Sequence, residues 1–86
     1  MDELIKLRSK IDIIDEKIMS LIAERLNLAG AIGRYKKKVG KPVKDDAREI
    51  EKIEKLAGIG LKYGIDRKTI EMIWEQFFKA SYTKEK

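Results

Sequence analysis

A long amphipathic stretch at the start of the chain limits what this sequence of 86 residues can fold into. Between residues 1 and 39, apolar residues recur at alternating steps of three and four for about five heptads. This spacing is typical of a long helix that packs along its length against another helix, and it predicts a helix from Asp2 to about Val39. The apolar seam positions are Leu4, Leu7, Ile11, Ile14, Ile18, Leu21, Leu28, Ile32, Tyr35 and Val39.

Such a helix is too long for one small domain. At 1.5 Å per residue, roughly 36 residues span about 54 Å, which exceeds the diameter of a domain of this size. The ends of the helix would therefore project with bare apolar residues unless a second copy of the chain covered them. The sequence predicts a homodimer for this reason.

One seam position carries a charge. Arg25 stands where an apolar residue belongs, and a guanidinium in a packed seam is costly unless an anion meets it. Two interpretations remain open from the seam alone. Arg25 could pair with a carboxylate of the protein or extend to solvent, or it could bind an anionic ligand.

The rest of the chain predicts two shorter helices. Gly40 and the proline that follows it end the first helix. Asp45 or Asp46 caps the second, and Asp46 has capping-box spacing to the glutamate three residues later. Three glycines weaken its end, which we expect between residues 57 and 63. Its apolar stripe consists of Ala47, Ile50, Ile53, Ala57 and Leu61.

Asp66 is the expected cap of a third helix, whose apolar face turns polar toward its end at Ser81 and Glu85. No segment alternates with the period of a strand. The sequence therefore predicts an all-α fold in one domain, residues 1–86, with three helices of which the first is very long. The third stripe contains Ile70, Ile73, Trp74, Phe77 and Phe78.

Composition excludes several kinds of site. The chain has no cysteine and no histidine, so thiolate metal sites and histidine general bases are absent, and we expect neither a metal nor a cofactor. A net charge of +5 suits an anionic partner, either a small acid or nucleic acid. No apolar run reaches transmembrane length, and the first residues are unlike a signal peptide, so we expect a cytoplasmic protein.

Two further cations on the first helix bear on Arg25. Lys36 follows Arg25 by eleven residues, which places both on nearly the same face of the helix, about 16 Å apart. The two side chains could therefore converge on one ligand. The alternative is that Lys36 is exposed to solvent. Arg8 precedes Arg25 by 17 residues and cannot share a ligand with it on the same helix. Arg8 therefore belongs to a separate surface or reaches the site of a partner chain.

Charged residues also gather where the second helix begins. Asp45, Arg48 and Glu49 lie where backbone N–H groups favour anions. Capping and local ion pairs are the alternative explanation for these residues, and the helical period places Arg48 toward solvent.

These residues carry a resemblance. With the runs at residues 7–25, 32–37 and 41–51, the sequence resembles the all-helical, AroQ-type chorismate mutases over essentially its full length. The shared pattern is an Arg before an I-D-x-I-D-like run, A-E-R in mid-helix, a Lys about three turns later, and P-V-x-D-x-x-R-E opening the second helix. The resemblance implies an intertwined homodimer with two active sites and three helices in each protomer.

The resemblance also implies roles for the residues that match. Arg25 would bind a carboxylate of the substrate chorismate, and Arg8 would bind one across the dimer interface. Arg48 would add a cationic contact, and Ser81 would contact a carboxylate.

The remaining matching residues would act on the rest of the substrate. Lys36 would donate a hydrogen bond to the ether oxygen of the breaking C–O bond, and Glu85, if protonated, would donate another. Glu49 would accept one from the ring hydroxyl, and Asp45 would shape that end of the pocket.

The implied function is the rearrangement of chorismate to prephenate in phenylalanine and tyrosine biosynthesis. For this function we expect neither nucleic acid nor a membrane as a partner. The nearest enzymatic rival is an isochorismate pyruvate lyase of the same fold. Two functions without catalysis also fit a helical dimer. One is a plain dimerisation module, which leaves Arg25 unexplained, and the second is a nucleic-acid-binding protein. Nucleic acid would be bound through Lys36, Lys37, Lys38, Lys41 and Lys44.

Overall fold

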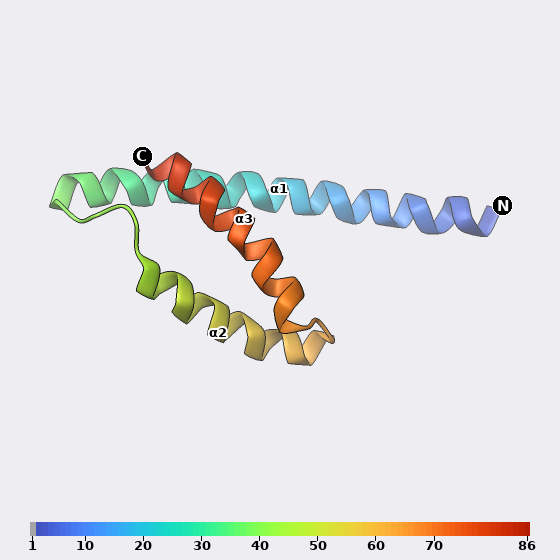
Figure 1. Ribbon diagram of the computed structural model, residues 1–86. Helices are drawn as coiled ribbons and strands as arrows, with labels where there is room; N and C mark the ends of the chain where they lie inside the picture. The colour runs from blue at the N-terminus through green and yellow to red at the C-terminus, as the bar shows by residue number, and fades with distance from the viewer. Residues whose placement is uncertain (1) are drawn as a thin grey trace.

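The computed structural model describes residues 2–86, which form three α-helices (Figure 1). They are α1 (Asp2–Val39), α2 (Asp46–Tyr63) and α3 (Arg67–Glu85), and the described residues include no strand. The predicted all-α fold is confirmed, as are the bounds of the long first helix. No helix among residues 2–86 combines the length and the apolar character that crossing a bilayer requires.

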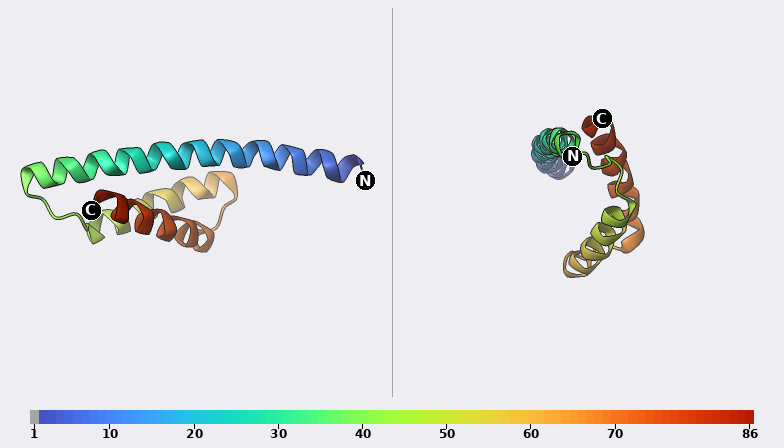
Figure 2. Two further views of the ribbon diagram at one scale, coloured as in Figure 1. Left: turned by 90° about the horizontal axis from the view of Figure 1, so that it is seen from above. Right: turned by 90° about the vertical axis from the view of Figure 1, so that its left-hand side faces the viewer.

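The helices form an elongated molecule of 57 × 24 × 16 Å. Helix α3 packs against both α1 and α2, whereas α1 and α2 do not pack on each other within the described residues. Both short helices lie to one side of α1 and cover only its C-terminal half, so its N-terminal half projects as a bare arm (Figures 1 and 2). The chain thus places its core where α3 crosses α1.

Local signals in the sequence explain how α2 begins. Gly40 has a φ of +74°, a left-handed conformation that suits glycine and ends α1. Asp45 caps α2 and accepts a hydrogen bond from the backbone N–H of Arg48 at 3.0 Å. The expected capping box at Asp46 is wrong, because the side chain of Glu49 pairs instead with Lys44 at 2.8 Å.

The α2–α3 turn follows the same rules. Gly64 is the left-handed C-cap of α2, with a φ of +69°, and the N–H of Ile65 donates to the carbonyl of Gly60 at 2.9 Å. Asp66 caps α3 as predicted, since its carboxylate accepts from the N–H of Thr69 at 2.7 Å. That hydrogen bond lowers the pKa of Asp66.

Small residues allow α3 to approach α1 closely. Ala29 and Gly33 are the buried residues of α1. A Cβ atom on Gly33 would lie 2.6 Å from the Cα of Glu85, closer than real Cβ contacts allow. The last turn of α3 therefore rests directly on the backbone of α1.

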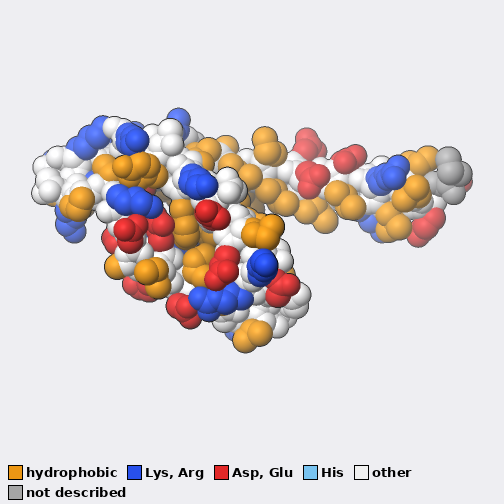
Figure 3. Space-filling model, in the orientation of Figure 1, with side chains coloured by type: hydrophobic (Ala, Val, Ile, Leu, Met, Phe, Trp, Pro, Cys, Tyr) orange, Lys and Arg blue, Asp and Glu red, His pale blue; other side chains and the backbone are white. Residues whose placement is uncertain are grey.

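The apolar seam of α1 lies on a different face from this contact. Seam residues such as Ile14 (53% exposed) and Leu21 (62% exposed) remain uncovered in the single chain. Hydrophobic side chains are visible along the projecting arm (Figure 3). The chain itself provides nothing among residues 2–86 that packs on the N-terminal half of the seam.

The predicted stripes of the short helices are only partly buried. On α3, Ile70 and Ser81 are buried, and Trp74 packs edge-on against Phe77 with ring centroids 5.3 Å apart. On α2 the contact face is rotated from the predicted stripe, so Ile50 and Leu61 are exposed. The apolar residues of α2 that are at least half-buried there, with Gly60, are Ile53, Leu56 and Ala57.

Candidate active site

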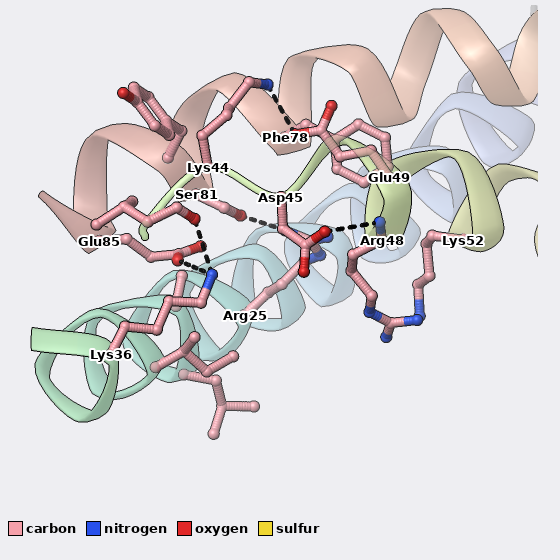
Figure 4. Close-up of a pocket in the computed structure, with 15 residues that line it drawn as sticks. Arg25, Lys36, Lys44, Asp45, Arg48, Glu49, Lys52, Phe78, Ser81 and Glu85 are labelled. Carbon is pink, nitrogen blue, oxygen red and sulfur yellow. Dashed lines mark hydrogen bonds and ion pairs between the residues drawn. The ribbon is translucent and has the colours of Figure 1, made fainter. Parts of the chain in front are cut away.

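A pocket of about 440 Å³ lies where the three helices meet (Figure 4). Its walls come from the second half of α1, the segment that leads into α2, the first turns of α2 and the end of α3. Residues far apart in the sequence thus meet in one cavity. The predicted site residues that line it are Arg25, Lys36, Asp45, Arg48, Glu49, Ser81 and Glu85.

Arg25 is half-buried at one end of this pocket. Its guanidinium donates a hydrogen bond to the hydroxyl of Ser81 and lies 5.4 Å from the ring centroid of Phe77. No carboxylate among residues 2–86 forms an ion pair with it. Burial lowers the pKa of Arg25, and the charge of Glu85 only partly opposes this effect. The charged seam position therefore faces the cavity with a neutral hydroxyl as its hydrogen-bond partner.

Lys36 and Glu85 form the opposite end of the site. The Lys36 ammonium donates to the carbonyl oxygen of Val43 at 2.8 Å and to Glu85 Oε1 at 2.9 Å. Both side chains are largely buried, with 18% and 14% of their surface exposed. The solvated alternative for Lys36 is thus wrong. The close approach at Gly33, one turn before Lys36, brings Glu85 within reach.

The first turns of α2 form the third wall. Arg48 is exposed, as the helical period predicts, yet its side chain borders the pocket. Asp45 points its carboxylate toward the N-terminus of α2, as Figure 4 shows. Glu49 pairs with Lys44, and this interaction raises the pKa of Lys44.

Several lining residues were not expected from the sequence. Lys52 follows Arg48 by one helical turn, so the i, i+4 rule applied to Arg48 could have found it. Lys44 lies 5.6 Å from the ring centroid of Tyr82, a contact that no local pattern signals. The apolar part of the lining consists of Leu28, Ala29, Ile32, Val43 and Phe78.

Arg8 is the one predicted site residue that the structure leaves outside the pocket. It precedes Arg25 by 17 residues on the same continuous helix, a distance of about 25 Å along the axis. Its own chain cannot bring it to this cavity.

The pocket can bind an anion in an oriented way. Its lining includes five cationic and three acidic side chains, and the cations are spread over α1, α2 and the segment between them. A rigid helical framework holds them, so charge-assisted hydrogen bonds could fix a small acid in one conformation.

Comparison with known proteins agrees with this geometry. Residues 7–86 match the family model described as chorismate mutase type II. The chain is 35% identical over 78 residues to the bifunctional chorismate mutase/prephenate dehydratase of Escherichia coli, a match that covers 91% of this chain and 20% of that protein. It is also 35% identical over 66 residues to the chorismate mutase of Methanocaldococcus jannaschii, covering 77% of this chain and 67% of that one.

A third relative has the same printed name as the Escherichia coli protein. The bifunctional chorismate mutase/prephenate dehydratase of Aquifex aeolicus is 36% identical over 89 residues, covering all of this chain and 25% of that protein. The chain thus spans about a fifth to a quarter of the length of these bifunctional relatives. The family match extends over nearly the whole sequence and includes every residue of the pocket. The chain belongs to the chorismate mutase type II family.

Proposed function

We propose that this chain catalyses the rearrangement of chorismate to prephenate. The observation that carries the proposal is the position of Arg25. It lies in the apolar seam of α1, faces a pocket rich in cations, and has no carboxylate partner among residues 2–86. Family membership supports the same reaction. We place the reaction in the cytoplasm and in phenylalanine and tyrosine biosynthesis as part of this proposal.

The reaction suits a site built from charge and shape. It is a pericyclic [3,3] rearrangement, so it requires neither a nucleophile nor a proton transfer. Its transition state is a compact chair in which negative charge grows on the ether oxygen. A site that holds both carboxylates of the substrate in the chair lowers the entropic part of the barrier. In our proposal Arg25, Ser81 and Arg48 hold the carboxylates.

The opposite end of the pocket would stabilise the developing charge. A lysine ammonium has three donors, and Lys36 uses two of them on Val43 and Glu85. The third could reach the ether oxygen of the substrate, where a preorganised donor is most effective. Glu49 would accept a hydrogen bond from the ring hydroxyl, and Asp45 would complete that wall.

Glu85 sets a pH dependence in this proposal. A carboxyl group donates to the ether oxygen only when protonated, and an ionised one would repel the growing charge. We expect Glu85→Gln, whose amide donates at every pH, to make kcat/KM less dependent on pH than it is in the original chain. Steady-state rates from acidic to alkaline pH provide the measurement.

A matched control exists on the same helix. Glu75 is exposed on α3 and does not line the active-site pocket, so Glu75→Gln should keep the pH profile of the original chain. A Glu85→Gln profile that coincides with the Glu75→Gln profile would remove Glu85 from the mechanism.

We also propose that the active form is a homodimer. The apolar seam along the N-terminal half of α1 is exposed, because α2 and α3 do not cover this part of the helix. A second copy related by a two-fold axis could lay its own seam on this surface. Arg8 would then lie in the pocket of the partner, which explains how a residue about 25 Å from its own Arg25 can take part.

A mixed dimer tests this arrangement. Arg8→Ala and Arg25→Ala should each abolish most activity alone. A dimer that contains one chain of each variant has one site with both defects and one intact site. Unfolding and refolding an equal mixture should therefore restore about a quarter of the original activity, because half of the dimers are mixed. Activity no greater than the mean of the two variants' activities would show that Arg8 does not cross the interface.

The reaction itself is tested directly. Chorismate added to the protein should disappear, as followed by its ultraviolet absorbance, with prephenate as the product. Release of pyruvate from isochorismate would instead identify the lyase. Absence of both reactions would leave a binding or dimerisation module.

A further inference from the structure

The pocket contains a cation that the proposed mechanism does not use. Lys52 lies on α2 one turn beyond Arg48, and it lines the same cavity as Arg48 and Arg25. Figure 4 shows the side chains of Arg48 and Lys52 extending from α2 side by side, toward the same side of the helix. Their positions place two positive charges at one edge of the pocket.

The cations of the pocket fall into two groups. The ammonium groups of Lys36 and Lys44 each donate a hydrogen bond to a glutamate side chain of the chain, at 2.9 and 2.8 Å. Arg25, Arg48 and Lys52 form no ion pair within residues 2–86. The cations without a carboxylate partner thus line one cavity from two helices, α1 and α2, and an anionic ligand there would supply the missing partner.

The surroundings of Lys52 are unfavourable without such a ligand. The side chain is half-buried, and burial lowers its pKa, as do the positive charges of Arg48, Lys55 and Arg25. Like charges at i and i+4 on a helix destabilise it. A solvated lysine would extend away from these neighbours. An anion placed between Lys52 and Arg48 turns the repulsion into attraction.

We propose that Lys52 is a further substrate-binding residue, which together with Arg48 binds one carboxylate of the substrate at the α2 wall of the pocket. The proposal rests on the proposed function and adds a residue to its binding site. Two adjacent cations on one rigid helix would fix the carboxylate from two directions, while Arg25 and Ser81 hold the substrate from α1 and α3.

The test compares Lys52→Gln with a control from the same helix. Lys55→Gln removes an identical charge from an exposed position outside the pocket. We expect Lys52→Gln to raise the KM for chorismate about tenfold with little change in kcat, and Lys55→Gln to change neither. The dissociation constant of prephenate, measured by calorimetry, should rise by the same factor. Lys52→Arg, which keeps the charge, should recover most of the loss.

Each contrary outcome contradicts the proposal in a recognisable way. If KM is the same for Lys52→Gln and Lys55→Gln, Lys52 does not contact the substrate. If Lys52→Gln instead lowers the melting temperature or weakens the dimer without raising KM, Lys52 is an interface residue. If the unaltered chain does not convert chorismate, the proposed function fails, and this result is distinct from a failure of the Lys52 variants alone.

Discussion

Arg25→Ala is expected to lower kcat/KM for chorismate about 100-fold or more. The guanidinium is the half-buried cation that faces both the pocket and the hydroxyl of Ser81, and alanine would leave a substrate carboxylate without a charged partner in a partly desolvated site. Steady-state kinetics with chorismate measure the effect. Rates close to those of the unaltered chain would contradict the proposed role of Arg25.

Arg34→Ala is the matched control for this variant. It removes the same charge from α1 at an exposed position that does not line the active-site pocket, so its kinetics should match those of the original chain. Both variants should keep the same helical circular dichroism and the same elution volume in size-exclusion chromatography. These two measurements separate the loss of a binding group from the loss of the fold.

Gly33→Ala is expected to damage the site without touching the ligand. The new methyl group would lie 2.6 Å from the Cα of Glu85 and 2.8 Å from its carbonyl carbon, so the last turn of α3 must shift. Overpacking of this kind costs about 1–3 kcal/mol, which lowers the melting temperature by roughly 5–15 °C in a domain of this size. Because Ser81 and Glu85 move with α3, we also expect at least a tenfold loss of kcat/KM.

Gly58→Ala provides the opposite result on α2. No atom lies within 4 Å of the position its Cβ would occupy. Replacing a glycine inside a helix by alanine favours the helix by about 0.5–1 kcal/mol. Gly58→Ala should therefore keep its activity and melt slightly higher. Equal behaviour of the two glycine variants would show that the contact between α3 and Gly33 is unimportant.

The sequence predicts the helices well because their signals are local. The apolar spacing, the left-handed glycine at Gly40 and the caps at Asp45 and Asp66 each act within a few residues. Arg25 stands out because a charge interrupts a strict pattern. The resemblance implies that Lys36 and Glu85 converge on one ligand atom, but no local pattern predicts it, because the two residues are 49 positions apart.

Some features escape the sequence for physical reasons. The packing face of α1 is determined by Ala29 and Gly33, whose small size permits close approach but gives almost no hydrophobic signal. The contact face of α2 differs from its apolar stripe, so Ile50 is exposed although its side chain is apolar. Lys52 resembles any solvated lysine until the pocket is seen.

The bare arm of α1 affects how the molecule acquires its structure. Every residue from Asp2 to Leu21 is exposed in the single chain, so no tertiary contact supports the helix there. In proteins, most of the stability of a helix comes from tertiary packing of its apolar face rather than from intrinsic propensity. In a dimer that covers the arm, the final gain in helicity would accompany the meeting of two chains. Refolding would then follow second-order kinetics and accelerate with protein concentration.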